Sequence, residues 1–158
     1  MDNQYLELQN ELAGSRQALQ DLLAGLSAAE WETAVYTENA TWQVIDLLRH
    51  LTEAESSMLR LMTLIRDGGA GVPDDFDLDR WNASRIKKTL GKSTDDLLAE
   101  MAQNRANLLA FMASLDETDW GKKGRHGSGH VLSIAEICAV IAEHEATHTA
   151  DIRAALGK

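Results

Sequence analysis

Two histidines stand four residues apart near the end of the chain, in the run His144-Glu145-Ala146-Thr147-His148. In an α-helix, residues at this spacing lie one turn apart on the same face. The surrounding residues predict that this face is apolar, because a stripe with a 3.6-residue period contains Ile134, Ile137, Ile141, His144, His148, Asp151, Ile152 and Ala155. Imidazoles at such positions need polar partners, since an unpaired buried polar group costs about 1–3 kcal/mol. A divalent metal ion bound by both rings is one such partner.

A third histidine, His50, interrupts a second apolar stripe. Residues 42–66 predict a long helix whose core face contains Leu47, His50, Leu51, Ala54, Met58, Leu61 and Ile65. Metal sites in helical bundles are built from core positions on facing helices. We therefore predict that His50, His144 and His148 bind one divalent ion. Three protein ligands leave a coordination position open, as in catalytic sites, where the ion could activate water or a thiol.

The identity of the ion and the partners of the histidines stay open at this stage. Three imidazoles suit zinc, nickel, iron and copper alike, and manganese is a further candidate. Each ligand's second ring nitrogen needs an acceptor. Asp151, Glu143 and either Glu53 or Glu55 are candidates that the sequence does not rank.

Two other functions compete with a bundle metalloenzyme. The histidine pair also matches the His-Glu-x-x-His motif of zinc proteases, in which Glu145 would be the general base. Only ten residues follow His148, with Asp151 as their sole acidic side chain, and no sheet is predicted to hold a peptide, so a protease is the remote alternative. The other alternative is a non-catalytic binding or dimerisation module whose histidines merely pack.

The elements expected to position these residues are all helical. Helices are predicted over residues 5–24, 42–66, 94–114 and 131–156, with Thr41 or Asn39, Ser93 and Ser133 as helix-capping residues. No alternation of apolar and polar residues predicts a strand. Residues 67–92 form a long crossover, with a helical turn expected around residues 83–90.

The two halves of the chain resemble each other. Leu26-Ser27-Ala28-Ala29-Glu30-Trp31 matches Leu115-Asp116-Glu117-Thr118-Asp119-Trp120, and upstream Arg16 aligns with Arg105. We therefore expect one domain over residues 1–158, an all-α four-helix bundle made of two similar helix pairs with long crossover connections. Downstream the match is shifted by one residue, so that Val44 aligns with Ile134 and Asp46 with Glu136. With this shift His50 matches Val140 and Ala54 matches His144, so the predicted metal ligands are not symmetric copies.

The charge and composition of the chain restrict its possible binding partners and its location. The formal net charge is −10 and the one basic cluster, Lys122-Lys123-Arg125, is short, which argues against a nucleic-acid partner. No apolar run reaches the length of a membrane span, and Met1-Asp2-Asn3-Gln4 does not resemble a signal peptide. The single Cys138 suits a reducing cytoplasm and is expected to be a buried thiol.

Taken together, these residues resemble the DinB-like (YfiT-like) family of metalloenzymes, whose superfamily includes mycothiol-dependent maleylpyruvate isomerase and bacillithiol S-transferases. The resemblance rests on four segments, in this order: residues 41–51, which end in His50; Arg80-Trp81-Asn82; Gly124-Arg125-His126; and residues 144–148. It implies a four-helix bundle, a metal on His50, His144 and His148, and often a homodimer.

In the characterised relatives the resemblance also implies chemistry on a low-molecular-weight thiol or a thiol adduct, with a small molecule as substrate. Asp151 stands where many relatives have Gln, so the partner of the nearby ligand is expected to differ. His126, as a catalytic residue, and Trp81, Asn82 and Arg125, as residues that bind a cofactor, match family positions that border the site. The alternative is that these residues have no functional role, with Arg125 and His126 in a solvated loop and Trp81 only packing in the fold.

Overall fold

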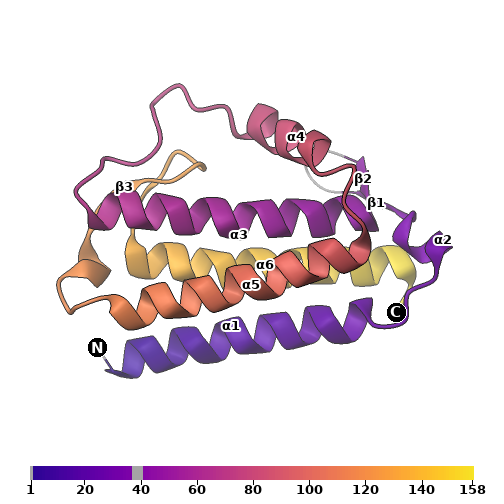
Figure 1. Cartoon of the computed structure of the whole chain (residues 1–158), viewed down its shortest axis with the longest axis horizontal. Helices are drawn as coiled ribbons and strands as arrows, with labels where there is room; N and C mark the ends of the chain where they lie inside the picture. The colour runs from indigo at the N-terminus through magenta and orange to yellow at the C-terminus, as the bar shows by residue number, and fades with distance from the viewer. Residues whose placement is uncertain (1, 37–40) are drawn as a thin grey trace.

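The computed structural model describes residues 2–36 and 41–158. Its framework is a bundle of four long helices, α1 (Asp2–Leu23), α3 (Val44–Arg66), α5 (Thr94–Ser114) and α6 (Ile134–Leu156), shown in Figure 1. The all-α bundle predicted from the apolar periodicity is thereby confirmed. No helix in the described part of the chain is long and apolar enough to cross a membrane.

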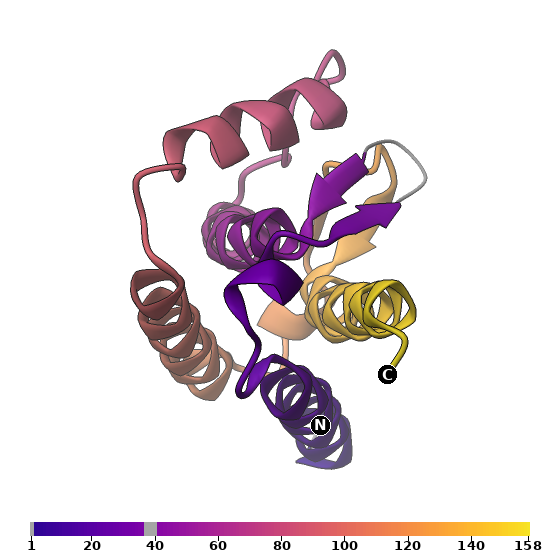
Figure 2. The same cartoon turned by 90° about the vertical axis from the view of Figure 1, so that its right-hand side faces the viewer.

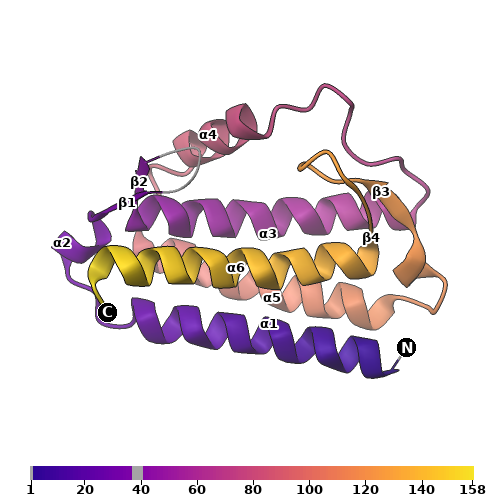
Figure 3. The same cartoon turned by 180° about the vertical axis from the view of Figure 1, so that it is seen from behind.

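The order of the four helices around the bundle explains the long crossover. Seen end-on in Figure 2, α3 lies beside both α5 and α6, and α6 in turn lies beside α1. Figure 1 shows that α3 and α5 run in the same direction, so the chain has to return along the whole bundle between them. Residues 67–93 make this return, and α4 (Leu78–Lys88) lies on the outer side of α3 (Figures 1 and 3).

Each half of the chain contains a short helical segment and a hairpin between its two long helices. The first half has α2 (Ala28–Trp31) and the strands β1 (Ala34–Tyr36) and β2 (Thr41–Gln43). The second has η1 (Asp119–Gly121) with β3 (Lys123–Arg125) and β4 (Val131–Ser133). Both hairpins are antiparallel, with Val35 opposite Trp42 and Gly124 opposite Leu132. The predicted duplication of a helix pair therefore extends to the connections.

These hairpins correct two predicted helix starts, one of which is the helix expected from Val131, since Val131–Ser133 form β4 and α6 begins at Ile134. The helix expected to begin at Trp42 begins at Val44, and Gln43, whose backbone N–H donates to Asp46, is its N-cap in place of Thr41. Asn39, the other expected cap, lies outside the described residues. Ser93 and Ser133 are N-caps as predicted, each accepting a hydrogen bond from the backbone N–H three residues later.

The crossover is attached to the second hairpin at Gly71. Backbone hydrogen bonds join Arg125 N–H to the carbonyl of Ala70 and Val72 N–H to the carbonyl of Arg125, at 2.8 and 2.9 Å. Gly71 has a φ of +97°, and a Cβ atom at this position would collide with the backbone of Arg125. The close approach of the two segments therefore requires glycine.

The core of the bundle consists of two apolar clusters separated by a layer of buried charges. One cluster contains Leu12, Met62, Leu108 and Ile137, and the other Leu19, Leu47, Leu97 and Ile152. Between them lie four charged side chains, one from each long helix: Arg16, Glu55, Arg105 and Glu145, all less than 10% exposed.

These four side chains, which we call the ion quartet, pair two positive with two negative charges. Arg16 Nε donates to Glu145 at 2.8 Å, and Arg105 Nη2 donates to Glu55 and to Glu145, each at 2.8 Å. Arg16 Nη2 also donates to Glu55 at 3.2 Å. A charge in the middle of an apolar core needs such partners, because an isolated buried charge is very costly.

The ion quartet follows the internal duplication of the chain. Arg16 donates from Nη1 to the carbonyl of Met101, and Arg105 donates from Nη1 to the carbonyl of Leu12. The two hydrogen bonds are reciprocal, since the sequence alignment of the halves pairs Arg16 with Arg105. The two halves thus meet around an approximate two-fold axis that passes through the quartet.

Candidate metal centre

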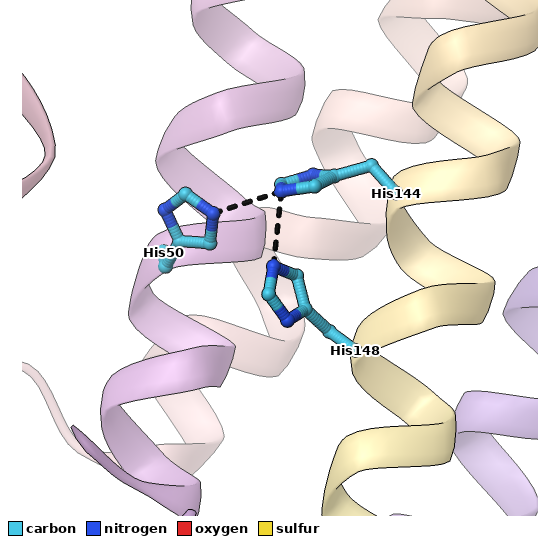
Figure 4. Close-up of side chains that lie close together, drawn as sticks. All are labelled: His50, His144 and His148. Carbon is cyan, nitrogen blue, oxygen red and sulfur yellow. Dashed lines mark hydrogen bonds between the residues drawn. The ribbon is translucent and has the colours of Figure 1, made fainter. Parts of the chain in front are cut away.

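The three histidines predicted as metal ligands lie together at the interface of α3 and α6. His50 comes from the second turn of α3, and His144 and His148 come from successive turns of α6. Figure 4 shows the three rings turned toward a common point. The Nε2 atom of His144 lies 2.9 Å from Nε2 of His50 and 3.1 Å from Nε2 of His148. One ligand atom of each ring lies within 4.8 Å of those of the other two.

Protons alone cannot satisfy this arrangement. The remaining ring nitrogen of His148, Nδ1, lies 3.1 Å from the carboxylate of Asp151, which can only accept, so the proton of a neutral His148 ring belongs on Nδ1. Its Nε2 then presents a lone pair to His144. Nε2 of His144 carries either one proton or one lone pair, so it cannot form a good hydrogen bond with both neighbouring rings. Whichever neutral tautomers are chosen, at least one of the three Nε2 atoms is therefore left without a hydrogen-bond partner, and a cation bound to three lone pairs would remove this mismatch.

The spacing of the nitrogens also suits a cation of the size of zinc. Ligands bound tetrahedrally at 2.0–2.1 Å would stand about 3.4 Å from one another. The distances of 2.9 and 3.1 Å are a few tenths of an ångström shorter, a difference that small side-chain rotations cover. The residues present thus fit a divalent ion with three imidazole ligands.

The surroundings keep the rings in the neutral form that binds metal. Burial lowers the pKa of His50 to about 3, with a smaller contribution from His148. Burial, followed by the nearby His50, lowers the pKa of His144 well below its ordinary value. The pKa of His148 is lowered by burial and partly restored by Asp151. Neutral rings at neutral pH offer their lone pairs to an ion without first losing a proton.

Two neighbouring side chains fix ring orientation. Asp151, one turn beyond His148 on α6, holds the Nδ1 side of that ring. Of the acceptors considered from sequence, Asp151 is the one in contact with a ligand, whereas Glu55 belongs to the ion quartet and Glu53 contacts Arg85. Trp42 packs against His50, with ring centroids 5.0 Å apart.

A cleft with a volume of about 640 Å³ opens above the three histidines. Its floor is formed by α3 and α6 and its cover by the crossover, α4 and the tip of the second hairpin. The lining includes Met58, Phe76, Trp81, Asn82, His126 and Asp151. A volume of this size is typical of sites for small molecules.

The structure separates the remaining predicted residues into two groups. Trp81, Asn82 and His126 line the cleft together with the histidines. The backbone N–H of Ser128 donates to Nδ1 of His126, so a neutral His126 ring carries its proton on Nε2. Arg125 lies outside the lining, and its guanidinium contacts Asp74 at 2.6 Å.

Glu145 lies in the ion quartet, outside the cleft lining, and both of its carboxylate oxygens accept hydrogen bonds from arginines. A carboxylate held in this way is poorly placed to take a proton from a water beside the histidines. The geometry therefore does not favour the protease alternative, in which Glu145 would be the general base.

The ion quartet was not predicted from the sequence, although the internal duplication contained a signal for it. The alignment that pairs Arg16 with Arg105 also pairs Glu55 with Glu145 when the one-residue shift of the later helices is applied. Four charged residues matched in this way at core positions indicate a shared buried cluster.

Comparisons with known proteins agree with this geometry. The sequence matches the DinB superfamily over residues 11–152. Among solved structures it is similar to TT2238, a four-helix bundle protein, with 25% identity, a TM-score of 0.67 and coverage of 95% of this chain and 98% of that one. No curated protein matches the sequence significantly.

Two further structures share the fold at lower identity. YfiT from Bacillus subtilis, described as a probable metal-dependent hydrolase with an unusual four-helix bundle topology, has 15% identity and a TM-score of 0.74 over 99% of this chain and 90% of that one. The mycothiol-dependent maleylpyruvate isomerase has 16% identity and a TM-score of 0.73 over 92% of this chain. The present chain covers 60% of that isomerase's length.

Proposed function

Because the chain belongs to the DinB superfamily, we propose that it is a divalent-metal-dependent enzyme whose ion is held by His50, His144 and His148. The observation that carries the proposal is the convergence of three Nε2 atoms that protons cannot satisfy. The similar structures include a probable metal-dependent hydrolase and a thiol-dependent isomerase, which supports transferase or hydrolase chemistry on a small molecule, linked to a thiol.

The chain's own residues would prepare the site as follows. Asp151 accepts the Nδ1 proton of His148 and so aims the lone pair on Nε2 at the ion. The largely apolar walls of the cleft would favour an apolar ligand, and His126, with its proton on Nε2, lies in the lining. When bound, the ion supplies a Lewis acid that polarises a ligand oxygen or favours the thiolate form of a sulfur ligand.

The direct test is the metal content of protein purified without a histidine tag and then exposed to zinc or nickel. We expect about one ion per chain by elemental analysis, and much less in the His50→Ala and His144→Ala variants. His130→Ala is the matched control, because His130 is exposed on the second hairpin and lies outside the cluster. Protein that remains metal-free after loading would contradict the proposal.

A second measurement separates a metal-binding bundle from one in which the histidines merely pack. If the histidines merely pack, a chelator leaves the melting temperature of the loaded protein unchanged. If they bind an ion, the chelator lowers it, and the His50→Ala variant no longer responds. A screen of electrophilic substrates with and without added thiol then tests the reaction class. A homodimer and a cytoplasmic location stay predictions, to be tested by light scattering and by fractionation.

A further inference from the structure

The cleft above the three histidines is one-sided in its charge. Among the described residues its lining contains two carboxylates, Asp79 on α4 and Asp151 on α6, and no lysine or arginine. Arg80, which is next to Asp79 in sequence, is exposed and lies outside the lining, and two other arginines of this region have partners away from the cleft. Arg125 contacts Asp74 at 2.6 Å, and Arg85 lies 3.2 Å from the carboxylate of Glu53 while its guanidinium stacks on Trp81.

The walls of the cleft are largely apolar. Met58 and Leu61 contribute from α3, and Val72, Phe76 and Trp81 contribute from the crossover and α4. The rings of Phe76 and Trp81 are neighbours, with centroids 6.4 Å apart. Such walls favour a hydrocarbon or aromatic body, and they offer a carboxylate or phosphate no cation in return for its lost hydration.

A metal ion on three neutral imidazoles would bring two positive charges to the floor of this cleft. It can accept one anionic donor atom, such as a thiolate, directly. A second negative charge on the same ligand would instead meet Asp79 or the apolar walls. The ion's charge therefore selects the donor atom, while the cover of the cleft selects the rest of the molecule.

We propose that the cleft binds ligands with a single metal-binding donor atom and an uncharged, apolar body, and that it discriminates against ligands whose body carries a carboxylate or phosphate. This substrate class rests on the proposed function, because the donor atom is placed by the metal ion. The residue that sets the discrimination is Asp79, which is exposed at the cleft wall and has no ion pair among the described residues.

The test uses the cobalt-loaded full-length protein and two thiols of nearly equal shape. In β-mercaptopropionate a carboxylate takes the place of the isopropyl group of isopentanethiol. Each is titrated while the sulfur-to-cobalt charge-transfer absorption and the tryptophan fluorescence are recorded. We expect isopentanethiol to bind at least tenfold more tightly than β-mercaptopropionate.

Two charge-reversing variants locate the origin of the preference. In Asp79→Lys the ratio of the two dissociation constants should fall at least fivefold, because a cation then faces the carboxylate. Asp75→Lys makes the same change of net charge on the same crossover, at an exposed residue outside the cleft lining, and should leave the ratio unchanged. Equal responses of the two variants would overturn the role of Asp79.

The possible failures are distinguishable. If no cobalt spectrum develops, the metal centre itself is wrong, and the inferred substrate class is wrong with it. If the cobalt spectrum is normal but β-mercaptopropionate binds as tightly as isopentanethiol, the substrate class alone is overturned. Trp81→Ala provides an independent check on the apolar wall, since it should weaken isopentanethiol binding while the cobalt spectrum of the thiol-free protein is retained.

Discussion

Removing the charge of Glu145 should destabilise the bundle strongly, whatever the protein catalyses. Glu145 is 3% exposed and accepts hydrogen bonds from both Arg16 and Arg105. In Glu145→Gln, the shape is kept but an amide NH₂ replaces one acceptor oxygen. Two guanidinium groups then share the single carboxylate of Glu55, and one positive charge in the core is left uncompensated.

The expected magnitude follows from the burial of the whole cluster. Breaking a buried ion pair by removing one partner costs about 3–5 kcal/mol. For a chain of this size each kcal/mol lowers the melting temperature by about 2–4 °C, so a decrease of about 6–20 °C is expected. Replacing all four members of the ion quartet by methionine should cost less than the single change, because no unpaired charge then remains.

The assay is urea unfolding followed by circular dichroism, with the melting temperature as a second measurement. The control is Glu143→Gln, since Glu143 is exposed on the same helix two residues away and should change the free energy of unfolding by less than about 0.5 kcal/mol. A Glu145→Gln protein as stable as the wild type, but inactive, would refute this reasoning and restore Glu145 as a candidate general base.

Three other substitutions or reagents test separate parts of the structure. Ser133→Ala removes the hydroxyl that accepts from the N–H of Glu136 at 3.1 Å, and should lower the free energy of unfolding by about 1 kcal/mol in urea titrations. Burial raises the pKa of the Cys138 thiol to about 12. The labelling is done near the usual thiol pKa of about 8.5, where an exposed thiol reacts readily. Iodoacetamide should then label the unfolded chain and leave the native protein almost unmodified, as followed by mass spectrometry. Gly71→Ala should cost about 1–3 kcal/mol in melting experiments, because φ is +97° and the added Cβ meets the backbone of Arg125, whereas Gly91→Ala, with no atom within 4 Å of its Cβ position, should be nearly neutral.

The cluster of three histidines could be predicted from sequence because helical periodicity is a local property. The spacing of His144 and His148 places them on one face, and His50 interrupts a regular stripe on another helix. Their convergence additionally required that α3 and α6 be neighbours, which no local pattern shows. The strands were missed for the opposite reason, since three-residue segments such as 34–36 are too short to show an alternation.

The position of Glu145 shows where periodicity alone misleads. The predicted core stripe of α6 passed through His144 and His148, which are half-buried at the edge of the bundle. The fully buried stripe instead runs through Ile134, Cys138, Ile141, Glu145, Thr149 and Ile152. A charged residue is predicted to be solvent-exposed unless its partners are known. Here the partners are arginines on two other helices. The cover of the cleft was likewise beyond prediction, because a crossover has no repeating pattern.

The helix α4 contributes no buried residue to the core, yet Leu78, Asp79 and Trp81 on it line the cleft. On the proposed function, part of the recognition of the bound molecule therefore falls on a stretch of the chain that adds nothing to the bundle core. Substitutions in residues 78–88 could redirect the protein toward another compound with little loss of folding stability. A scaffold organised in this way can acquire new specificities by exchanging one outer segment while the three imidazoles and the helices that carry them stay as they are.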